Sequence, residues 1–138
     1  MQPTLVDTDI LSFFLRGDQN VAKCFERYLS QYNKLNLSII TYYEIISGLK
    51  YKDAKKQLDV FRELVKCNQV LPLTSEACER AADIYALCRQ QGNPIDDIDL
   101  LIAGIALENN LALATHNVSH FSRINGLSVI DWTLEAAP

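Results

Sequence analysis

Four acidic or amide side chains lie where apolar segments of this chain begin or end. Asp7 follows an apolar stretch, Glu44 and Asp99 lie near the starts of apolar helical patterns, and Asn117 follows another apolar stretch. They are far apart in the sequence, but the rims of a buried sheet can bring such side chains together. Carboxylates that converge repel one another unless a cation joins them. The arrangement therefore predicts a site for a hard metal ion such as Mg²⁺.

The elements that must position these side chains alternate between short apolar strands and longer helices. This alternation predicts an α/β fold with a parallel sheet. The expected strands are 4–6, 35–39, 70–73, 112–114 and 127–130, and the expected helices are 10–15, 21–32, 41–49, 54–65, 75–90 and 97–108.

In α/β sheets the functional edge lies beyond the carboxyl ends of the strands. Asp7, the start of the helix that carries Glu44, and residues 115–117 all fall at that edge. Asp99 is the one charge inside the helical segment 98–107, which is apolar on nearly every side and is therefore expected to be buried. A carboxylate there is costly without a partner, and the positive helix start offsets only part of that cost. A metal ion or another partner is expected to supply the remainder.

Each of these residues also has an ordinary structural interpretation. Asp7 can cap the helix that follows the first strand. Thr41 and Glu44 have the spacing of a capping box, in which Glu44 reaches back to the helix start. Helix caps or a turn start are likewise expected at Asp96, Asp97 and Asn117. Only the joint placement of the set argues strongly for a shared site.

The length and composition favour one globular domain over residues 1–138. Apolar residues make up 49% of the chain and charged residues 22%. No apolar stretch reaches the roughly 18 residues of a spanning helix, and the amino terminus has no secretion signal pattern. We therefore expect a cytoplasmic protein that does not enter a membrane.

The formal charge of −4 argues against a protein that holds nucleic acid by its overall electrostatics. A nuclease can still combine a central acidic site with a local basic rim, although a solvated helix face is an alternative use of these cations. The candidates for such a rim are Arg16, Lys50, Lys52, Lys55, Lys56 and Arg123.

The cysteines form no Cys-x-x-Cys pair and lie among apolar or helical neighbours. Buried thiols are therefore expected in place of a disulfide framework or a zinc site. The residues concerned are Cys24, Cys67, Cys78 and Cys88.

Five sequence blocks, taken together, resemble the PIN-domain ribonucleases and, among them, the VapC-type toxins of bacterial toxin–antitoxin pairs. The blocks are LVDTDIL (5–11), SIITYYEIISG (38–48), DLLIA (99–103), LATHNVSHF (113–121) and GLSVIDW (126–132). The resemblance implies a three-layer α/β/α domain with a central, mainly parallel sheet, often a homodimer. It also implies RNA cleavage with Mg²⁺ or Mn²⁺ that leaves a 5′-phosphate and a 3′-hydroxyl, and a small VapB-type antitoxin as partner.

The resemblance also assigns residues position by position. Asp7 and Asp99 match the main metal-binding carboxylates of the family, and Glu44 matches the acidic residue that completes the cluster. Asn117 matches a fourth catalytic position that is acidic in many PIN domains, so one charge is missing here and a second metal is expected to bind less tightly. Further departures from the family pattern are Asp9, His116 and His120.

Two other functions fit parts of the sequence. Asp7 and Asp9 also resemble the Asp-x-Asp start of haloacid-dehalogenase-type phosphatases, although Leu11 departs from that motif and no lysine at a strand end is available to hold the phosphoryl group. A PIN-like protein that binds protein or RNA without catalysis is the second alternative. In the ribonuclease interpretation, Thr8 and Thr115 are expected to contact the carboxylates and hold them in place.

Overall fold

The computed structural model describes residues 1–134, so the last four residues of the expected domain lie outside the described part. Its sheet is parallel throughout, with the strand order β3-β2-β1-β4-β5. The strands are β1 (Thr4–Val6), β2 (Asn36–Ser38), β3 (Gln69–Leu71), β4 (Ala112–Ala114) and β5 (Val129–Ile130). The expected α/β class with a parallel sheet is confirmed.

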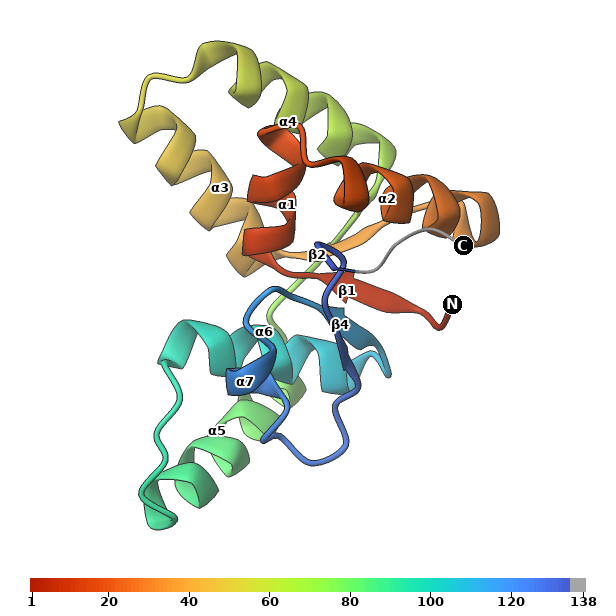
Figure 1. Ribbon diagram of the computed structural model, residues 1–138. Helices are drawn as coiled ribbons and strands as arrows, with labels where there is room; N and C mark the ends of the chain where they lie inside the picture. The colour runs from red at the N-terminus through yellow and green to blue at the C-terminus, as the bar shows by residue number, and fades with distance from the viewer. Residues whose placement is uncertain (135–138) are drawn as a thin grey trace.

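Helices cover both faces of this sheet and so form three layers (Figure 1). On one side lie α1 (Thr8–Leu15), α2 (Gln19–Tyr32), α3 (Ile39–Tyr51) and α4 (Lys55–Cys67). On the other side lie α5 (Ser75–Gln90), α6 (Asp97–Glu108) and the short α7 (Val118–Phe121).

Two apolar clusters hold the layers to the sheet. The cluster beneath α1–α4 contains the buried side chains of Val6, Phe61 and Trp132, and the cluster on the other face contains Leu5 and Ile105. Successive residues of β1 thus point to opposite faces, because side chains alternate along a strand. A strand that is buried on both faces usually has consecutive apolar residues, as Leu5 and Val6 of β1 show.

Helix α3 begins two residues earlier than the sequence predicts. The Ser38 hydroxyl accepts a hydrogen bond from the Thr41 backbone N–H at 3.0 Å, so Ser38 is the N-cap. The predicted strand 35–39 is accordingly too long at its end, since Ile39 already belongs to the helix. Residues 118–121 form a helix that the sequence did not predict, because a four-residue element shows no helical period.

Helices α5 and α6 approach each other very closely. A Cβ atom added at Gly104 of α6 would lie 2.3 Å from the Ala77 carbonyl oxygen of α5. No side chain larger than hydrogen fits there without movement of the backbone. The small residues Ala77, Ala81 and Gly104, all buried, therefore fix the distance between the two helices.

The expectation of four buried thiols was wrong for two of them. Cys24 and Cys88 are buried, whereas Cys67 and Cys78 are exposed on α4 and α5. Both exposed residues lie on amphipathic helices, and an apolar residue type in such a helix does not by itself indicate the inward face. Over residues 1–134, no helix has the length and apolar character needed to cross a membrane.

Candidate active site

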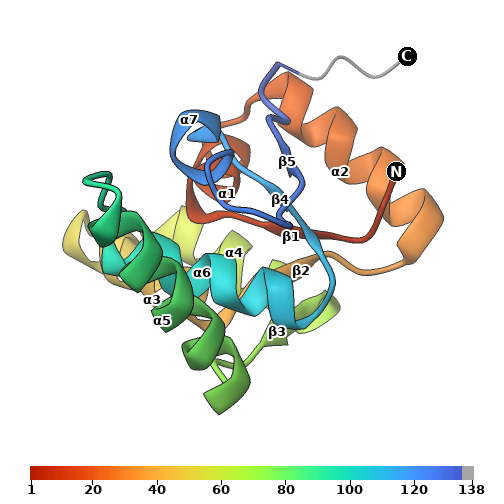
Figure 2. The same ribbon diagram turned by 90° about the horizontal axis from the view of Figure 1, so that it is seen from below.

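The four candidate residues from the sequence line one cleft at the carboxyl ends of the central strands. In Figures 1 and 2, α1, α7 and the start of α6 gather at this end of the sheet. The cleft has a volume of about 360 Å³. Its lining consists of Asp7, Thr8, Asp9, Ser12, Phe13, Arg16, Glu44, Asp99 and Asn117. The fold thus brings together side chains from the turn after β1, from α1, α3 and α6, and from the N-cap of α7.

Asp7 lies at the base of the cleft and is only 5% exposed. One carboxylate oxygen accepts a hydrogen bond from the Thr8 backbone N–H at 2.8 Å, and the other accepts one from the Thr115 hydroxyl at 2.7 Å. Burial, with smaller contributions from the charges of Asp9 and Asp99, raises the pKa of Asp7 to about 7. The charged form of the Asp7 carboxylate is therefore unfavourable in this position unless a cation lies near it.

Asp9 is the second carboxylate of the first turn of α1. Its Oδ2 accepts a hydrogen bond from the His116 backbone N–H at 3.0 Å, which ties α1 to the end of β4. Its Oδ1 is buried and has no hydrogen-bond partner within residues 1–134. Burial raises the pKa of Asp9 as well. A buried oxygen without a partner is uncommon in proteins, and a bound ion or water would satisfy this one.

Glu44 faces the cleft and does not serve as the helix cap that the sequence suggested. Its Oε1 accepts a hydrogen bond from the Thr8 hydroxyl at 2.6 Å, and that hydroxyl lies 2.9 Å from the Thr41 hydroxyl. The predicted capping box is therefore wrong, because Ser38 caps α3. The contact between Thr8 and Glu44 and the contact between Thr115 and Asp7 match those expected of the two threonines.

Asp99 projects into the cleft from the first turn of α6 and is about three-quarters buried. Burial raises its pKa, opposed by His120, whose Nδ1 lies 3.7 Å from Asp99 Oδ2. The same imidazole nitrogen lies 2.9 Å from the Asn117 side-chain nitrogen. The sequence marked His120 only as a departure from the family pattern and did not predict this contact. His120 follows Asn117 by three residues, and side chains at this spacing lie close together on a helix. This spacing was the sequence signal that could have placed His120 at the site.

Ser12 and Phe13 of α1 and Arg16 at its C-cap also line the cleft; of these, the sequence named only Arg16, as a candidate for the basic rim. Ser12, Phe13 and Arg16 follow Asp9 at intervals of three, four and seven residues, which is the spacing of one helix face. Phe13 also meets the His116 ring edge-on, with the ring centroids 5.2 Å apart. His116 in turn pairs with Asp131 at 2.9 Å and so forms the rim beside Phe13.

The donor atoms of the cleft suit a hard divalent cation. Among residues 1–134, no three His, Cys, Asp or Glu side chains converge closely enough to hold an ion by themselves. Mg²⁺, however, keeps several of its waters and is commonly bound by only one or two carboxylates. The Asp9 oxygen without a hydrogen-bond partner among residues 1–134 and the raised pKa of Asp7 both favour a cation beside these carboxylates. The residues therefore fit a hydrated Mg²⁺ or Mn²⁺ ion.

Comparison with protein families matches residues 4–127 to the PIN domain. Ribonuclease VapC1 of Haemophilus influenzae strain 86-028NP is 31% identical over 133 residues, which cover 94% of this chain and 97% of the relative. The tRNA(fMet)-specific endonuclease VapC of Shigella flexneri is 30% identical over 130 residues, with the same coverage of both chains.

Solved structures give the same result. The chain resembles a component of the DNA-bound VapBC complex of Salmonella typhimurium with a TM-score of 0.84 and 27% identity, over 96% of this chain and 99% of that one. It resembles a component of VapBC-1 from nontypeable Haemophilus influenzae with a TM-score of 0.82 and 32% identity, over 94% and 98% of the two chains. The similarity extends over nearly the whole length of each.

Proposed function

Because the chain belongs to the PIN-domain family, we propose that it is a metal-dependent endoribonuclease and the toxin of a toxin–antitoxin pair of the VapBC type. One observation carries this proposal: Asp7, Glu44 and Asp99, widely separated in sequence, line one cleft in a chain about 30% identical to VapC ribonucleases over nearly its full length. A small VapB-type antitoxin encoded beside this chain would hold the activity in check, as the VapBC complexes among the structural relatives suggest.

Asp7 and Asp99 are the proposed ligands of Mg²⁺ or Mn²⁺, and Glu44 completes the acidic set. A bound divalent ion would neutralise the charge of a phosphodiester and lower the barrier to attack by water. The hydrogen bonds from Thr8 and Thr115 support this assignment, because they hold the Glu44 and Asp7 carboxylates in fixed orientations before substrate arrives. Asn117 contributes a neutral amide at the position where the resemblance to PIN domains implies an acidic residue.

Glu44 is the proposed residue for positioning the attacking water. One Glu44 oxygen accepts a hydrogen bond from the Thr8 hydroxyl. The other oxygen can accept a hydrogen bond from the attacking water. The water oxygen bonds to phosphorus while the bond between phosphorus and O3′ breaks. The attacking water passes a proton to Glu44, and O3′ takes a proton from a solvent water as it leaves, so the products are a 3′-hydroxyl and a 5′-phosphate.

The two alternatives receive less support. The haloacid-dehalogenase-type phosphatase has no support among the PIN-domain and VapC similarities described above. A non-catalytic binding module does not require four acidic side chains around one cleft, and their mutual repulsion would only destabilise such a protein.

The test is cleavage of structured RNAs by the purified chain in Mg²⁺, beside the variant Asp99→Asn and a matched control, Asp97→Asn. Asp97 lies two residues away in the same helical turn but is exposed and outside the cleft. We expect cleavage by the wild type and by Asp97→Asn, and loss of cleavage in Asp99→Asn or in the presence of EDTA. Cleavage that survives both Asp99→Asn and EDTA would contradict the mechanism.

A further inference from the structure

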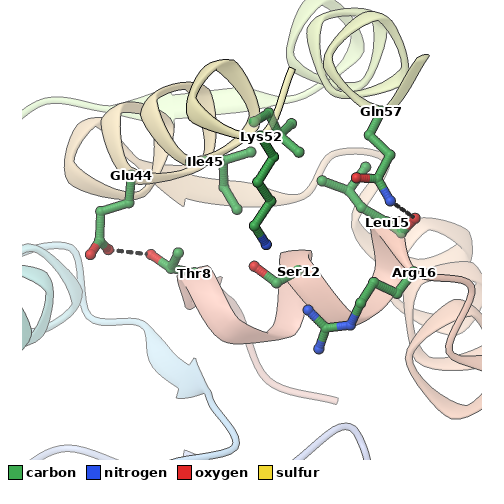
Figure 3. Close-up of a pocket in the computed structure, with 10 residues that line it drawn as sticks. Thr8, Ser12, Leu15, Arg16, Glu44, Ile45, Lys52 and Gln57 are labelled. Atoms are coloured by element: carbon green, nitrogen blue, oxygen red, sulfur yellow. Dashed lines mark hydrogen bonds between the residues drawn. The ribbon is translucent and has the colours of Figure 1, made fainter. Parts of the chain in front are cut away.

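A second pocket, drawn in Figure 3, lies next to the acidic cleft, and four residues line both. The pocket measures about 160 Å³. It is lined by Thr8, Ser12, Leu15, Arg16, Glu44, Ile45, Gly48, Leu49, Lys52 and Gln57, of which Thr8, Ser12, Arg16 and Glu44 also line the cleft. The two cavities are thus separated only by side chains that line both of them.

Two of the six cations suggested by the sequence line this pocket. Figure 3 shows the Lys52 amine and the Arg16 guanidinium extending toward Ser12 from two sides. Within residues 1–134, neither cation has a carboxylate partner within 4.0 Å, whereas Lys55 pairs with Asp53 at that distance. The Arg16 guanidinium stacks on the Phe13 ring, 4.8 Å from its centroid. Stacking leaves the N–H edges of the guanidinium available for an anion.

A purely structural role explains the two cations less well. Arg16 and Lys52 are the C-caps of α1 and α3, where a positive charge can stabilise the negative helix end. A side chain in that role turns toward the last carbonyl groups of its helix. Arg16 instead runs back along α1 toward Ser12, and Lys52 reaches across from α3 to the same point (Figure 3).

We propose that this pocket binds a backbone phosphate of the RNA strand, adjacent to the phosphate that is cleaved in the acidic cleft. The inference rests on the proposed function and adds the contacts that hold the substrate. An RNA strand carries a negative phosphate at every nucleotide, so a strand with one phosphate in the cleft presents a neighbouring one close by. Ser12 supplies a hydroxyl donor between the two cations, and Arg and Lys together with a hydroxyl are common phosphate ligands.

The charge distribution gives this pocket a specific task. The cleft contains Asp7, Asp9, Glu44 and Asp99, and the chain as a whole carries a formal charge of −4, so a polyanion is repelled on approach. Arg16 and Lys52, next to the cleft, attract the RNA strand locally at the point where it must be held. Lys52 touches only the second pocket, which separates its effect from that of the cleft.

The experiment compares Lys52→Gln with Lys56→Gln. Both variants remove one exposed lysine charge from the same region, but Lys56 lines neither cavity. Binding of a fluorescein-labelled single-stranded RNA is measured by anisotropy in EDTA over a range of salt concentrations. We expect Lys52→Gln to weaken binding about fivefold and to reduce the slope of log affinity against log salt by about 0.7, the value for one lost phosphate contact on a single strand. Lys56→Gln should change the affinity by less than about twofold, as expected for a charge outside the contact.

A second arm identifies the phosphate itself. The KM for cleavage in Mg²⁺ is compared between a cleavable RNA and versions in which single phosphates beside the cleavage site are replaced by uncharged methylphosphonates. One replacement should raise the KM of the wild type and of Lys56→Gln about fivefold and leave the KM of Lys52→Gln unchanged, because the partner charge is already gone. Lys52→Arg should restore the sensitivity.

The two proposals fail in different ways. Absence of cleavage with any RNA in Mg²⁺ contradicts the proposed function, while the binding arm still tests the pocket. Equal affinities and salt slopes for Lys52→Gln and Lys56→Gln overturn the phosphate pocket even if the wild type cleaves RNA. Loss of antitoxin binding in Lys52→Gln with unchanged RNA affinity would also overturn it, since the pocket would then be a protein-binding site.

Discussion

The acidic cleft and the α5–α6 interface differ in what holds their atoms close together. In the cleft, burial and, to a smaller extent, the charges of Asp9 and Asp99 raise the pKa of Asp7, so the carboxylates are unfavourably placed without a cation. At the α5–α6 interface, Gly104 and Ala77 meet closely because both are small, and their proximity excludes voids. Helix α6 takes part in both regions, since its first turn carries Asp99 and its middle carries Gly104. The packed α5–α6 interface therefore holds Asp99 in the cleft, although the other carboxylates there repel it.

The largest expected effect concerns Asp7 in the cleft. Asp7→Asn keeps the shape of the side chain and retains an acceptor for the Thr8 N–H, but removes the charge. We expect the kcat for RNA cleavage to fall about 1000-fold, which corresponds to about 4 kcal/mol of lost transition-state stabilisation. Circular dichroism should show an intact fold. A kcat within tenfold of the wild type would remove Asp7 from the catalytic set.

The next largest effect concerns the α5–α6 interface. Gly104→Ala places a methyl group against the Ala77 carbonyl and should lower the free energy of unfolding by about 2–3 kcal/mol, as overpacking of a rigid core does. Urea denaturation measures the change. Gly48→Ala on α3 is the control, because nothing lies within 4 Å of the added Cβ. That variant should be more stable than the wild type by about 0.5–1 kcal/mol. If both substitutions behave alike, the close approach is not what stabilises the interface.

The pH dependence of stability offers a sharper comparison. The pKa of Asp7 is raised to about 7 in the folded state, so the folded chain holds that proton more tightly than the unfolded chain does. In EDTA, the Asp7 contribution should be neutral below about pH 4, become destabilising as the pH rises toward 7, and stay constant above that. We expect Asp7→Asn to exceed the wild type in free energy of unfolding by about 1–2 kcal/mol at pH 8, and not at pH 4.

Mg²⁺ should reverse this difference. At pH 8 the ion is expected to raise the melting temperature of the wild type and to leave that of Asp7→Asn nearly unchanged, because binding to the folded state alone stabilises it. Thermal unfolding in EDTA and in excess Mg²⁺ measures both. An equal response of the two proteins to Mg²⁺ would show that the ion binds elsewhere.

The smallest expected effect concerns the hydroxyl that orients Glu44. Thr8→Val removes the donor to Glu44 and should lower kcat about fivefold to tenfold, about 1 kcal/mol, with little change in stability. Thr8→Ser keeps the hydroxyl and should retain nearly full activity. A loss of activity in Thr8→Ser equal to that in Thr8→Val would assign the effect to the lost methyl group and its packing.

The sequence predicts well those features that depend on local pattern. The bounds of β1, β4, α5 and α6 agree with the structure residue for residue, because apolar runs and helix caps mark them. The convergence of Asp7, Glu44, Asp99 and Asn117 was also predictable, since carboxyl ends of parallel strands share one edge.

Other features depend on contacts between distant segments. Ser38 and Thr41 are both good caps. The hydrogen bond from the Thr41 N–H to the Ser38 hydroxyl shows that Ser38 caps α3, while the Thr41 hydroxyl contacts Thr8 of α1. The pocket between Arg16 and Lys52 requires α1 and α3 to be adjacent, which no local period reveals. For the same reason, the sequence offered six candidate cations for a basic rim without distinguishing these two.

The position of β1 in the sheet has a consequence for the order in which the protein is made. β1 is the first strand to be synthesised and pairs with β4, whose residues follow roughly a hundred positions later. Asp7 gains its hydrogen bond from Thr115 only after that later segment has joined the sheet. Pairing over such a separation makes folding slow and delays it until β4 has been synthesised. A ribosome-bound chain that stops short of residue 115 therefore carries Asp7, Glu44 and Asp99 but lacks Thr115 and Asn117, so the cleft is not yet assembled.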